Sequence, residues 1–130
     1  MKIFYFFLVG VCAVQAFSPS AYGAYEKGDS WMGEILFVTN CSKCHSVDAW
    51  EENKVGPNLY GVFGRRSGEV SGFNYSNAMR YESVVWDGDT LYDYLENPQI
   101  YLAGTKDRFA GFKSETERND LIAYLKKATQ

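Results

Sequence analysis

The chain is organised around one short stretch, Cys41-Ser42-Lys43-Cys44-His45. Two thiols three residues apart, followed at once by an imidazole, form a pattern that is typical of covalent c-type haem attachment. On one helical turn both cysteines can reach the two vinyl groups of a porphyrin edge, and the next residue can offer the iron a ring nitrogen. The stretch therefore predicts one haem c, bound through Cys41 and Cys44, with His45 as the proximal iron ligand.

The same pattern also occurs in zinc sites and in dithiol redox pairs. A zinc site needs four nitrogen or sulfur ligands, but outside the motif the sequence has only Cys12 and no second histidine. A thioredoxin-like pair needs a βαβ context, which the sequence does not show. Both interpretations are therefore disfavoured against haem attachment.

Length and composition limit the kind of protein this can be. The 130 residues are enough for one domain, and 46% of them are hydrophobic. The aromatic fraction of 17% suits a pocket for a flat macrocycle, and equally suits a small core that uses large side chains. The formal charge of -3, without a basic stripe, argues against a nucleic-acid partner and weakens the case for docking through a dense ring of lysines.

Residues 1–16 are typical of a secretory signal peptide. Lys2 supplies the positive charge, and residues 3–13 form an apolar run too short to span a bilayer comfortably. Small residues at Val14-Gln15-Ala16 fit a cleavage site, although cleavage as late as residue 24 is also open. An uncleaved N-terminal anchor is the alternative.

Residues 17–27 are predicted to be a loose leader, and residues 28–130 a monohaem domain. Cleavage of the signal would remove Cys12, so that only the two haem cysteines remain and no disulfide is implied. Export fits the haem prediction, because thioether attachment generally happens outside the cytoplasm. We therefore expect an extracytoplasmic location, in the periplasm or on a secretory route, with the mitochondrial intermembrane space as the alternative.

Periodicity and capping residues predict helices separated by long loops. Gly33 and Phe37 lie four apart on one helical face, where a glycine allows another helix to approach closely. The glycine-rich loop of residues 46–74 is long enough to suggest that it folds over a ligand. With no strand pair indicated, the expected class is all-α. The predicted helices are 29–40 (capped by Asp29 or Ser30), 76–82, 89–96 (capped by Asp89 or Thr90 and stopped by Pro98) and 114–128, with a loop at 99–114.

Several motifs follow one another along residues 28–129. They are the attachment stretch, Val55-Gly56-Pro57-Asn58-Leu59-Tyr60-Gly61, the segment from Gly64 to Ser76, Trp86, the segment from Leu91 to Pro98, and a pairing of Gly33 and Phe37 with Leu121 and Tyr124. Together they resemble the class I cytochromes c of the mitochondrial type and their close bacterial relatives. The resemblance implies the cytochrome c fold, in which the terminal helices cross and short helices and long loops wrap round one covalent haem.

The resemblance also implies roles for pocket residues. The carbonyl of Pro57 would accept the second N–H of the His45 imidazole, which fixes the ring and raises its basicity. Hydrogen-bond donors would satisfy a buried haem propionate, because burying a carboxylate without them is costly. The implied donors are Arg65, Tyr75 and Trp86, and the other implied pocket residues are Tyr94, Leu95, Thr105 and Phe109.

The sequence departs from the family at its distal loop, Gly104-Thr105-Lys106-Asp107-Arg108-Phe109-Ala110-Gly111. Asp107 stands where the family has a methionine ligand, and neither Met32 nor Met79 lies on a segment expected to replace it. A soft thioether favours ferrous iron and raises the reduction potential, whereas a hard carboxylate favours ferric iron. Either Asp107 coordinates, or Lys106 deprotonates and coordinates, or the sixth position is empty or holds water. Asp107 is equally open to interpretation as a solvated loop carboxylate.

The resemblance implies a single-electron carrier rather than an enzyme, shuttling electrons between complexes of a respiratory-type chain through a haem edge near Cys44 and Phe109. The expected partners are membrane reductase and oxidase complexes, with membrane contact only through them, no nucleic acid and a monomeric state. Some lysines either meet an acidic partner or are ordinary surface residues. These lysines are Lys43, Lys54, Lys106 and Lys113.

An open distal site would favour a different function. A haem peroxidase or a small-ligand-binding sensor could use Asp107 as an acid–base group beside Arg108. A third interpretation is a paralogue that binds haem and no longer transfers electrons physiologically. Peroxide turnover, carbon monoxide binding and reduction by membrane complexes distinguish the three.

Overall fold

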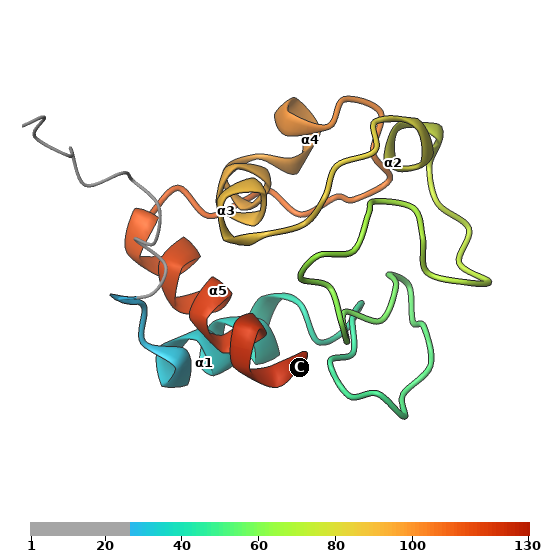
Figure 1. Cartoon of the computed structure of the whole chain (residues 1–130). Helices are drawn as coiled ribbons and strands as arrows, with labels where there is room; N and C mark the ends of the chain where they lie inside the picture. The colour runs from blue at the N-terminus through green and yellow to red at the C-terminus, as the bar shows by residue number, and fades with distance from the viewer. Residues whose placement is uncertain (1–26) are drawn as a thin grey trace, which may run out of the picture.

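The computed structural model describes residues 27–130, which are helical with long connecting loops (Figure 1). Within this range β pairing is limited to an isolated bridge between Arg66 and Val85, so the all-α prediction is confirmed. The predicted signal peptide lies outside the described residues. None of the described helices is long and apolar enough to cross a membrane. The helices are α1 (Ser30–Asn40), α2 (Asn77–Tyr81), α3 (Gly88–Glu96), α4 (Pro98–Tyr101) and α5 (Glu115–Ala128).

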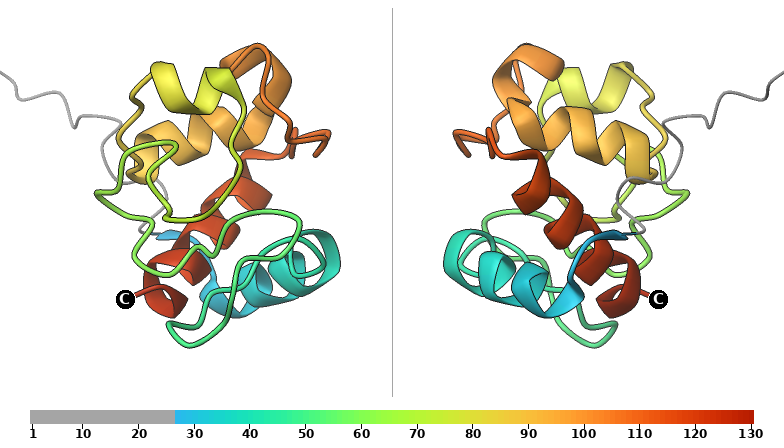
Figure 2. Two further views of the ribbon diagram at one scale, coloured as in Figure 1. Left: turned by 90° about the vertical axis from the view of Figure 1, so that its right-hand side faces the viewer. Right: turned by 90° about the vertical axis from the view of Figure 1, so that its left-hand side faces the viewer.

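The first and last helices cross each other, as predicted (Figure 2). Gly33 makes this crossing close, because a Cβ there would lie 1.9 Å from the carbonyl oxygen of Asp120. One turn further on, the ring of Phe37 packs 5.4 Å from that of Tyr124. The Asp29 N–H also donates to Asp120 Oδ1 at 2.7 Å, which fixes the start of α1 against α5.

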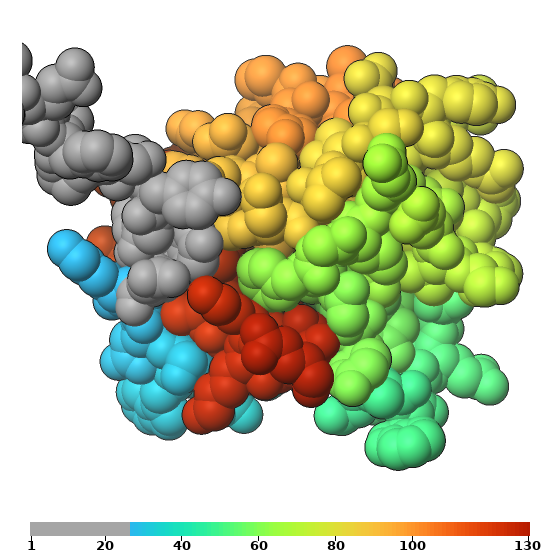
Figure 3. All heavy atoms as spheres, in the orientation of Figure 1, coloured from blue at the N-terminus to red at the C-terminus, as the bar shows by residue number. Residues whose placement is uncertain are grey.

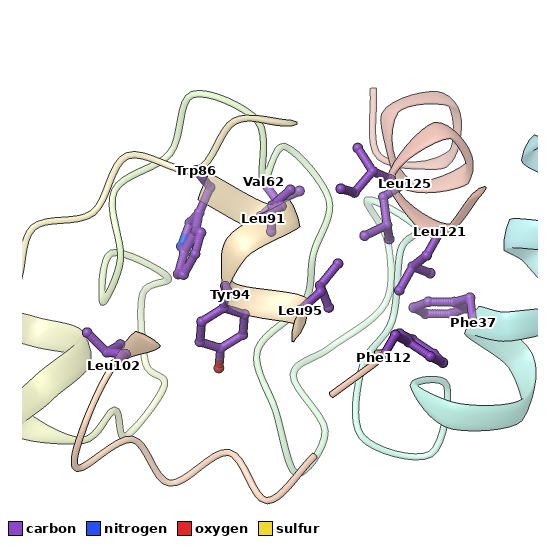
Figure 4. Packing of buried hydrophobic residues seen from close by; sticks show 11 residues of the cluster. Phe37, Val62, Trp86, Leu91, Tyr94, Leu95, Leu102, Phe112, Leu121 and Leu125 are labelled. Carbon is purple, nitrogen blue, oxygen red and sulfur yellow. The ribbon is translucent and has the colours of Figure 1, made fainter. Parts of the chain in front are cut away.

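The buried apolar side chains lie on both sides of α3 (Figure 4). Phe37 and Leu121 gather on the side of α1 and α5, whereas Trp86 and Tyr94 lie together on the opposite side. Leu91 and Leu95 of α3 lie between these groups. Helix α3 therefore links the terminal-helix pair to the loops.

The helix boundaries depart from the sequence prediction in two places. Helix α3 begins at Gly88, and its cap is Asp87, whose carboxylate accepts the Thr90 N–H at 2.8 Å while Thr90 Oγ1 accepts the Asp87 N–H. The predicted caps Asp89 and Thr90 were therefore placed too late. Pro98 ends α3 as expected but also opens α4, because proline at a first helical position lacks only an N–H that would be unpaired there.

The long loop between α1 and α2 is held by backbone hydrogen bonds to distant segments. The N–H of Gly64 donates to the Trp86 carbonyl and that of Ser67 to the Val84 carbonyl, both at 2.7 Å. The Gly61 N–H donates to the carbonyl of Thr129 at 2.7 Å, just beyond α5. Backbone hydrogen bonds therefore fix this loop to the segment before α3 and to the end of the chain, and its role in folding over a ligand stays a prediction.

Candidate haem site

The proximal side is built around the imidazole of His45. Its Nδ1–H donates to the carbonyl oxygen of Pro57 at 2.7 Å, which leaves Nε2 available for iron. Gly56 allows the imidazole to lie this close to the backbone, because a Cβ at position 56 would lie 2.3 Å from Cε1 of the ring. The Gly56 N–H in turn donates to the Cys44 carbonyl at 2.8 Å. The polypeptide alone therefore forms the predicted hydrogen bond between His45 and Pro57.

The two cysteines lie on the turn that ends α1. The N–H groups of Cys44 and His45 both donate to the Cys41 carbonyl, at 3.0 and 2.9 Å, so one tight turn presents all three side chains. Both thiols are free and partly buried. Burial raises the pKa of the Cys41 thiol to about 12, and the charges of Asp107 and Cys44 add to the rise.

On the distal loop, the carboxylate of Asp107 is fixed from two directions. The hydroxyl of Tyr94 donates to Oδ2 at 2.7 Å, and the backbone N–H of Phe109 donates to Oδ1 at 2.9 Å. Burial, followed by the charge of Asp107, raises the pKa of the Tyr94 phenol far above its ordinary value, so the phenol stays a donor. Asp107 is thus a half-buried, hydrogen-bonded acceptor, and the interpretation as a solvated carboxylate that touches nothing is wrong.

The backbone of the same loop is held by its neighbours. The buried hydroxyl oxygen of Thr105 accepts the Asp107 N–H at 3.2 Å, and the side-chain amide of Gln99 donates to the Asp107 carbonyl. Lys106 Nζ donates to the Asn74 carbonyl at 3.1 Å, which joins this loop to the segment before α2. Sequence reasoning missed Gln99 and Asn74, because nothing in their spacing indicates a contact with the distal loop.

Two of the residues that the resemblance assigned to a propionate are polar side chains that lie close together. Arg65 and Tyr75 are neighbours, and burial lowers the pKa of the guanidinium and raises that of the phenol. The guanidinium donates to the carbonyls of Tyr60 and Asn58 at 2.9 and 3.1 Å, and the hydroxyl of Tyr75 accepts the Val70 N–H.

Trp86 is joined to Arg65 through the backbone, because its N–H donates to the Arg65 carbonyl at 2.9 Å, while its side chain lies within the buried core. Its ring is 7% exposed and packs 5.0 Å from the ring of Tyr94, edge to face. Tyr94 therefore connects Trp86 on one side to Asp107 on the other. Phe109 is partly buried and packs 4.9 Å from Phe112, which ties the end of the distal loop to the core.

These observations fit a covalently held haem and define a class of protein. One turn carries both thiols and the imidazole, and a backbone carbonyl orients the imidazole so that its other nitrogen stays available. Residues 27–130 contain no cluster of three or more His, Cys, Asp or Glu side chains that could bind a metal ion directly. The fold and site are those of a small helical protein that carries one haem of the c type.

Comparison with known proteins identifies the family within that class. Residues 32–129 match the family model described as Cytochrome c. The chain is 51% identical over 104 residues to a cytochrome c of Kluyveromyces lactis, and this alignment covers 80% of the chain and 94% of the yeast protein. It is 52% identical over 102 residues to a cytochrome c of Sesamum indicum, covering 78% and 92%. The chain belongs to the cytochrome c family.

Membership of this family establishes the cofactor and the general activity. The protein is an electron-transfer haemoprotein, not an enzyme, and its homologues act with redox partner complexes. Its haem c is bound covalently through Cys41 and Cys44. The haem supplies a single iron that gains and loses one electron.

Proposed function

We propose that this protein is an electron carrier of lowered reduction potential, in which Asp107 occupies the distal side of the haem. The observation that supports this most directly is the fixed carboxylate, which accepts hydrogen bonds from Tyr94 and Phe109. Each of its oxygens retains a further lone pair. A fixed negative charge beside an iron centre stabilises the ferric state whether or not it coordinates, so the potential falls in either case.

The other distal candidates receive less support. The ammonium of Lys106 is already used in the hydrogen bond to Asn74, which would have to break before this nitrogen could approach iron. Met32 is exposed on α1, and Met79 is partly buried on α2 against the apolar core. We therefore assign the distal position to Asp107.

The proximal and peripheral roles follow the contacts already described. We assign His45 as the iron ligand, because its Nδ1 is bonded to Pro57 and its Nε2 remains available. Arg65, Tyr75 and Trp86 are proposed to stabilise the haem propionates. The proximity of Arg65 to Tyr75 supports this for two of them. Thr105 and Phe109 are proposed to line the distal side, where they hold the loop that carries Asp107.

The partner surface and compartment are also proposed. The ammonium groups of three surface lysines donate hydrogen bonds to backbone carbonyls: Lys54 to that of Ser42, Lys106 to that of Asn74 and Lys113 to that of Glu96. These hydrogen bonds hold loops in place, and an acidic partner would contact the three lysines as separate exposed charges rather than as a dense ring.

Similarity to yeast and plant proteins favours the intermembrane space over the periplasm that the N-terminal sequence suggested.

The electron-carrier proposal is tested against the open-site peroxidase by replacing Asp107 with asparagine in haem-loaded protein. A general acid–base group typically contributes 10²–10⁴-fold to the rate of the reaction it serves. We expect slow peroxide consumption that changes less than about threefold in Asp107→Asn, together with one reversible one-electron wave in both proteins. Rapid peroxide turnover that falls by about a hundredfold in the variant would support the enzyme instead.

A further inference from the structure

Helix α1 has a second apolar face that its contact with α5 leaves uncovered. Gly33 and Phe37 are buried against α5, whereas Trp31, Ile35 and Val38 remain 65%, 42% and 59% exposed. Their spacing of four and three residues places these three side chains on one stripe. We call them the α1 stripe. Figure 3 shows the start of α1, in blue, at the molecular surface beside α5 in red.

The groove along the α1 stripe contains little that would hold a charged partner. It is lined by the three apolar side chains together with Glu34 and Thr39. The hydroxyl of Thr39 is already used, because it donates to the Ile35 carbonyl at 2.7 Å. Helix α1 contains no lysine or arginine, and Glu34 is its single charged residue. The surface is therefore apolar and weakly acidic, which disfavours an anionic ligand.

The size of the stripe argues against a second copy of the chain as its partner. A stable dimer usually buries about 800 Å² on each partner, contributed by roughly 20–30 residues. Three side chains on a helix of 11 residues are far fewer than this. An apolar helix face with an exposed tryptophan is, in contrast, sufficient for contact with the headgroup region of a bilayer, where tryptophan is enriched.

The sequence before α1 favours the same partner. Residues 3–13 are an almost uninterrupted apolar run, and only 16 residues separate them from Ser30 at the start of α1. A chain that keeps this run would bring α1 to a bilayer, and the α1 stripe would face the lipid. The net charge of -3 makes a zwitterionic surface a better match than an anionic one.

We propose that the α1 stripe binds a zwitterionic lipid surface directly, in addition to any contact through membrane complexes. The site is the outer face of α1, and its main contact is Trp31, the most exposed of the three side chains. This proposal is independent of Asp107 and of the reduction potential, because it concerns side chains on the opposite face of α1 from Phe37.

The test is co-sedimentation of haem-loaded protein with phosphatidylcholine vesicles, followed by haem absorbance. The full chain and a chain that begins at Phe17 are compared, each with and without Trp31→Ser/Ile35→Ser. The matched control is Val55→Ser/Ile100→Ser, which removes two other apolar side chains that are each 79% exposed. Haem spectra and the midpoint potential of each variant confirm that the fold and the redox site are unchanged.

We expect both chain lengths to bind the vesicles at low and high salt, the full chain more tightly. The α1 variant should bind about tenfold more weakly or worse in both, because its apolar area no longer leaves water. The control should bind like the parent. Binding that needs anionic lipid and disappears in salt would overturn the proposal. So would equal loss in the control, a shorter chain that does not bind, or dimerisation without vesicles that the α1 substitutions abolish.

Discussion

At the scale of single residues, the hydrogen bonding of Asp107 is the feature that defines the distal loop. Tyr94 and Phe109 hold the two carboxylate oxygens, and Thr105 holds the backbone N–H of the same residue. Hydrogen bonds to an ionised group are about twice as strong as neutral ones. The carboxylate is thus kept in place at the loop position where the resemblance implies a methionine ligand.

Replacement of Tyr94 with phenylalanine should make the reduction potential still lower. The hydroxyl withdraws charge from Asp107 Oδ2, so its loss leaves a more negative carboxylate that stabilises ferric iron further. We expect a fall on the order of 50 mV, together with a loss of stability of about 1.5–3 kcal/mol. Voltammetry and denaturant titration measure the two effects. A potential that rises, or is unchanged, would show that this hydrogen bond does not act on the iron.

At the scale of helices, short elements are held by caps because they bury few side chains. Helix α3 has only nine residues, yet it carries Tyr94 and connects the two parts of the core. Its capping box joins Asp87 and Thr90 in both directions. The cap therefore helps to position the hydroxyl that holds Asp107.

Substitution of Asp87 by alanine should lower the free energy of unfolding by about 1 kcal/mol, the usual cost of a lost N-cap. The same change at Asp89, which lies in the first turn but is not the cap, should cost only a few tenths of a kcal/mol through the helix dipole. Thermal unfolding of the two variants provides the comparison. Equal destabilisation would contradict the assignment of Asp87 as the cap.

The helices and the attachment turn were predictable from sequence because they depend on neighbours along the chain. Spacing and caps were sufficient for α1 and α5, and the spacing of Cys41, Cys44 and His45 was sufficient for the turn. The resemblance also gave the contact of His45 with Pro57 correctly. The sequence does not predict helix α4, because a proline at position 98 indicates only the end of the preceding helix.

Contacts between segments far apart in the sequence could not be predicted in the same way. The link from Lys106 to Asn74 spans 32 residues. The buried Arg118 donates to the carbonyl of Phe112 at 2.6 Å and lies 4.2 Å from the ring centre of Tyr92. Such a residue reads as an ordinary surface charge on a helix, since burial of arginine is uncommon. Only the folded chain shows what it contacts.

At the scale of the whole molecule, we expect the haem to complete the apolar core, which lies on both sides of α3. The most extensive contact between the described helices is that of α1 with α5, whereas residues 41–76 form loops without a helix. Trp86 and Tyr94 lie on the loop side of α3 (Figure 4). The bound macrocycle would be the apolar group against which this side packs.

Loss of covalent attachment should therefore destabilise the loops before the terminal helices. In Cys41→Ser/Cys44→Ser, we expect a lower and broader thermal transition, because a group that binds only the folded state stabilises it. Hydrogen exchange should show loss of protection in residues 41–76 and retention at the crossing of α1 and α5. A variant that melts with the same midpoint and sharpness would show that the polypeptide is a complete core by itself.

The most direct test of the account is the midpoint potential of the haem-loaded protein beside that of Asp107→Met. The substitution replaces a fixed negative oxygen by a neutral thioether at the same loop position, so ferrous iron gains stability. Axial ligands tune haem potentials over about 0.8 V, and we expect the variant to lie higher by about 100 mV or more. Equal potentials in the two proteins would mean that Asp107 does not act on the iron, and would contradict the proposed lowering of the potential.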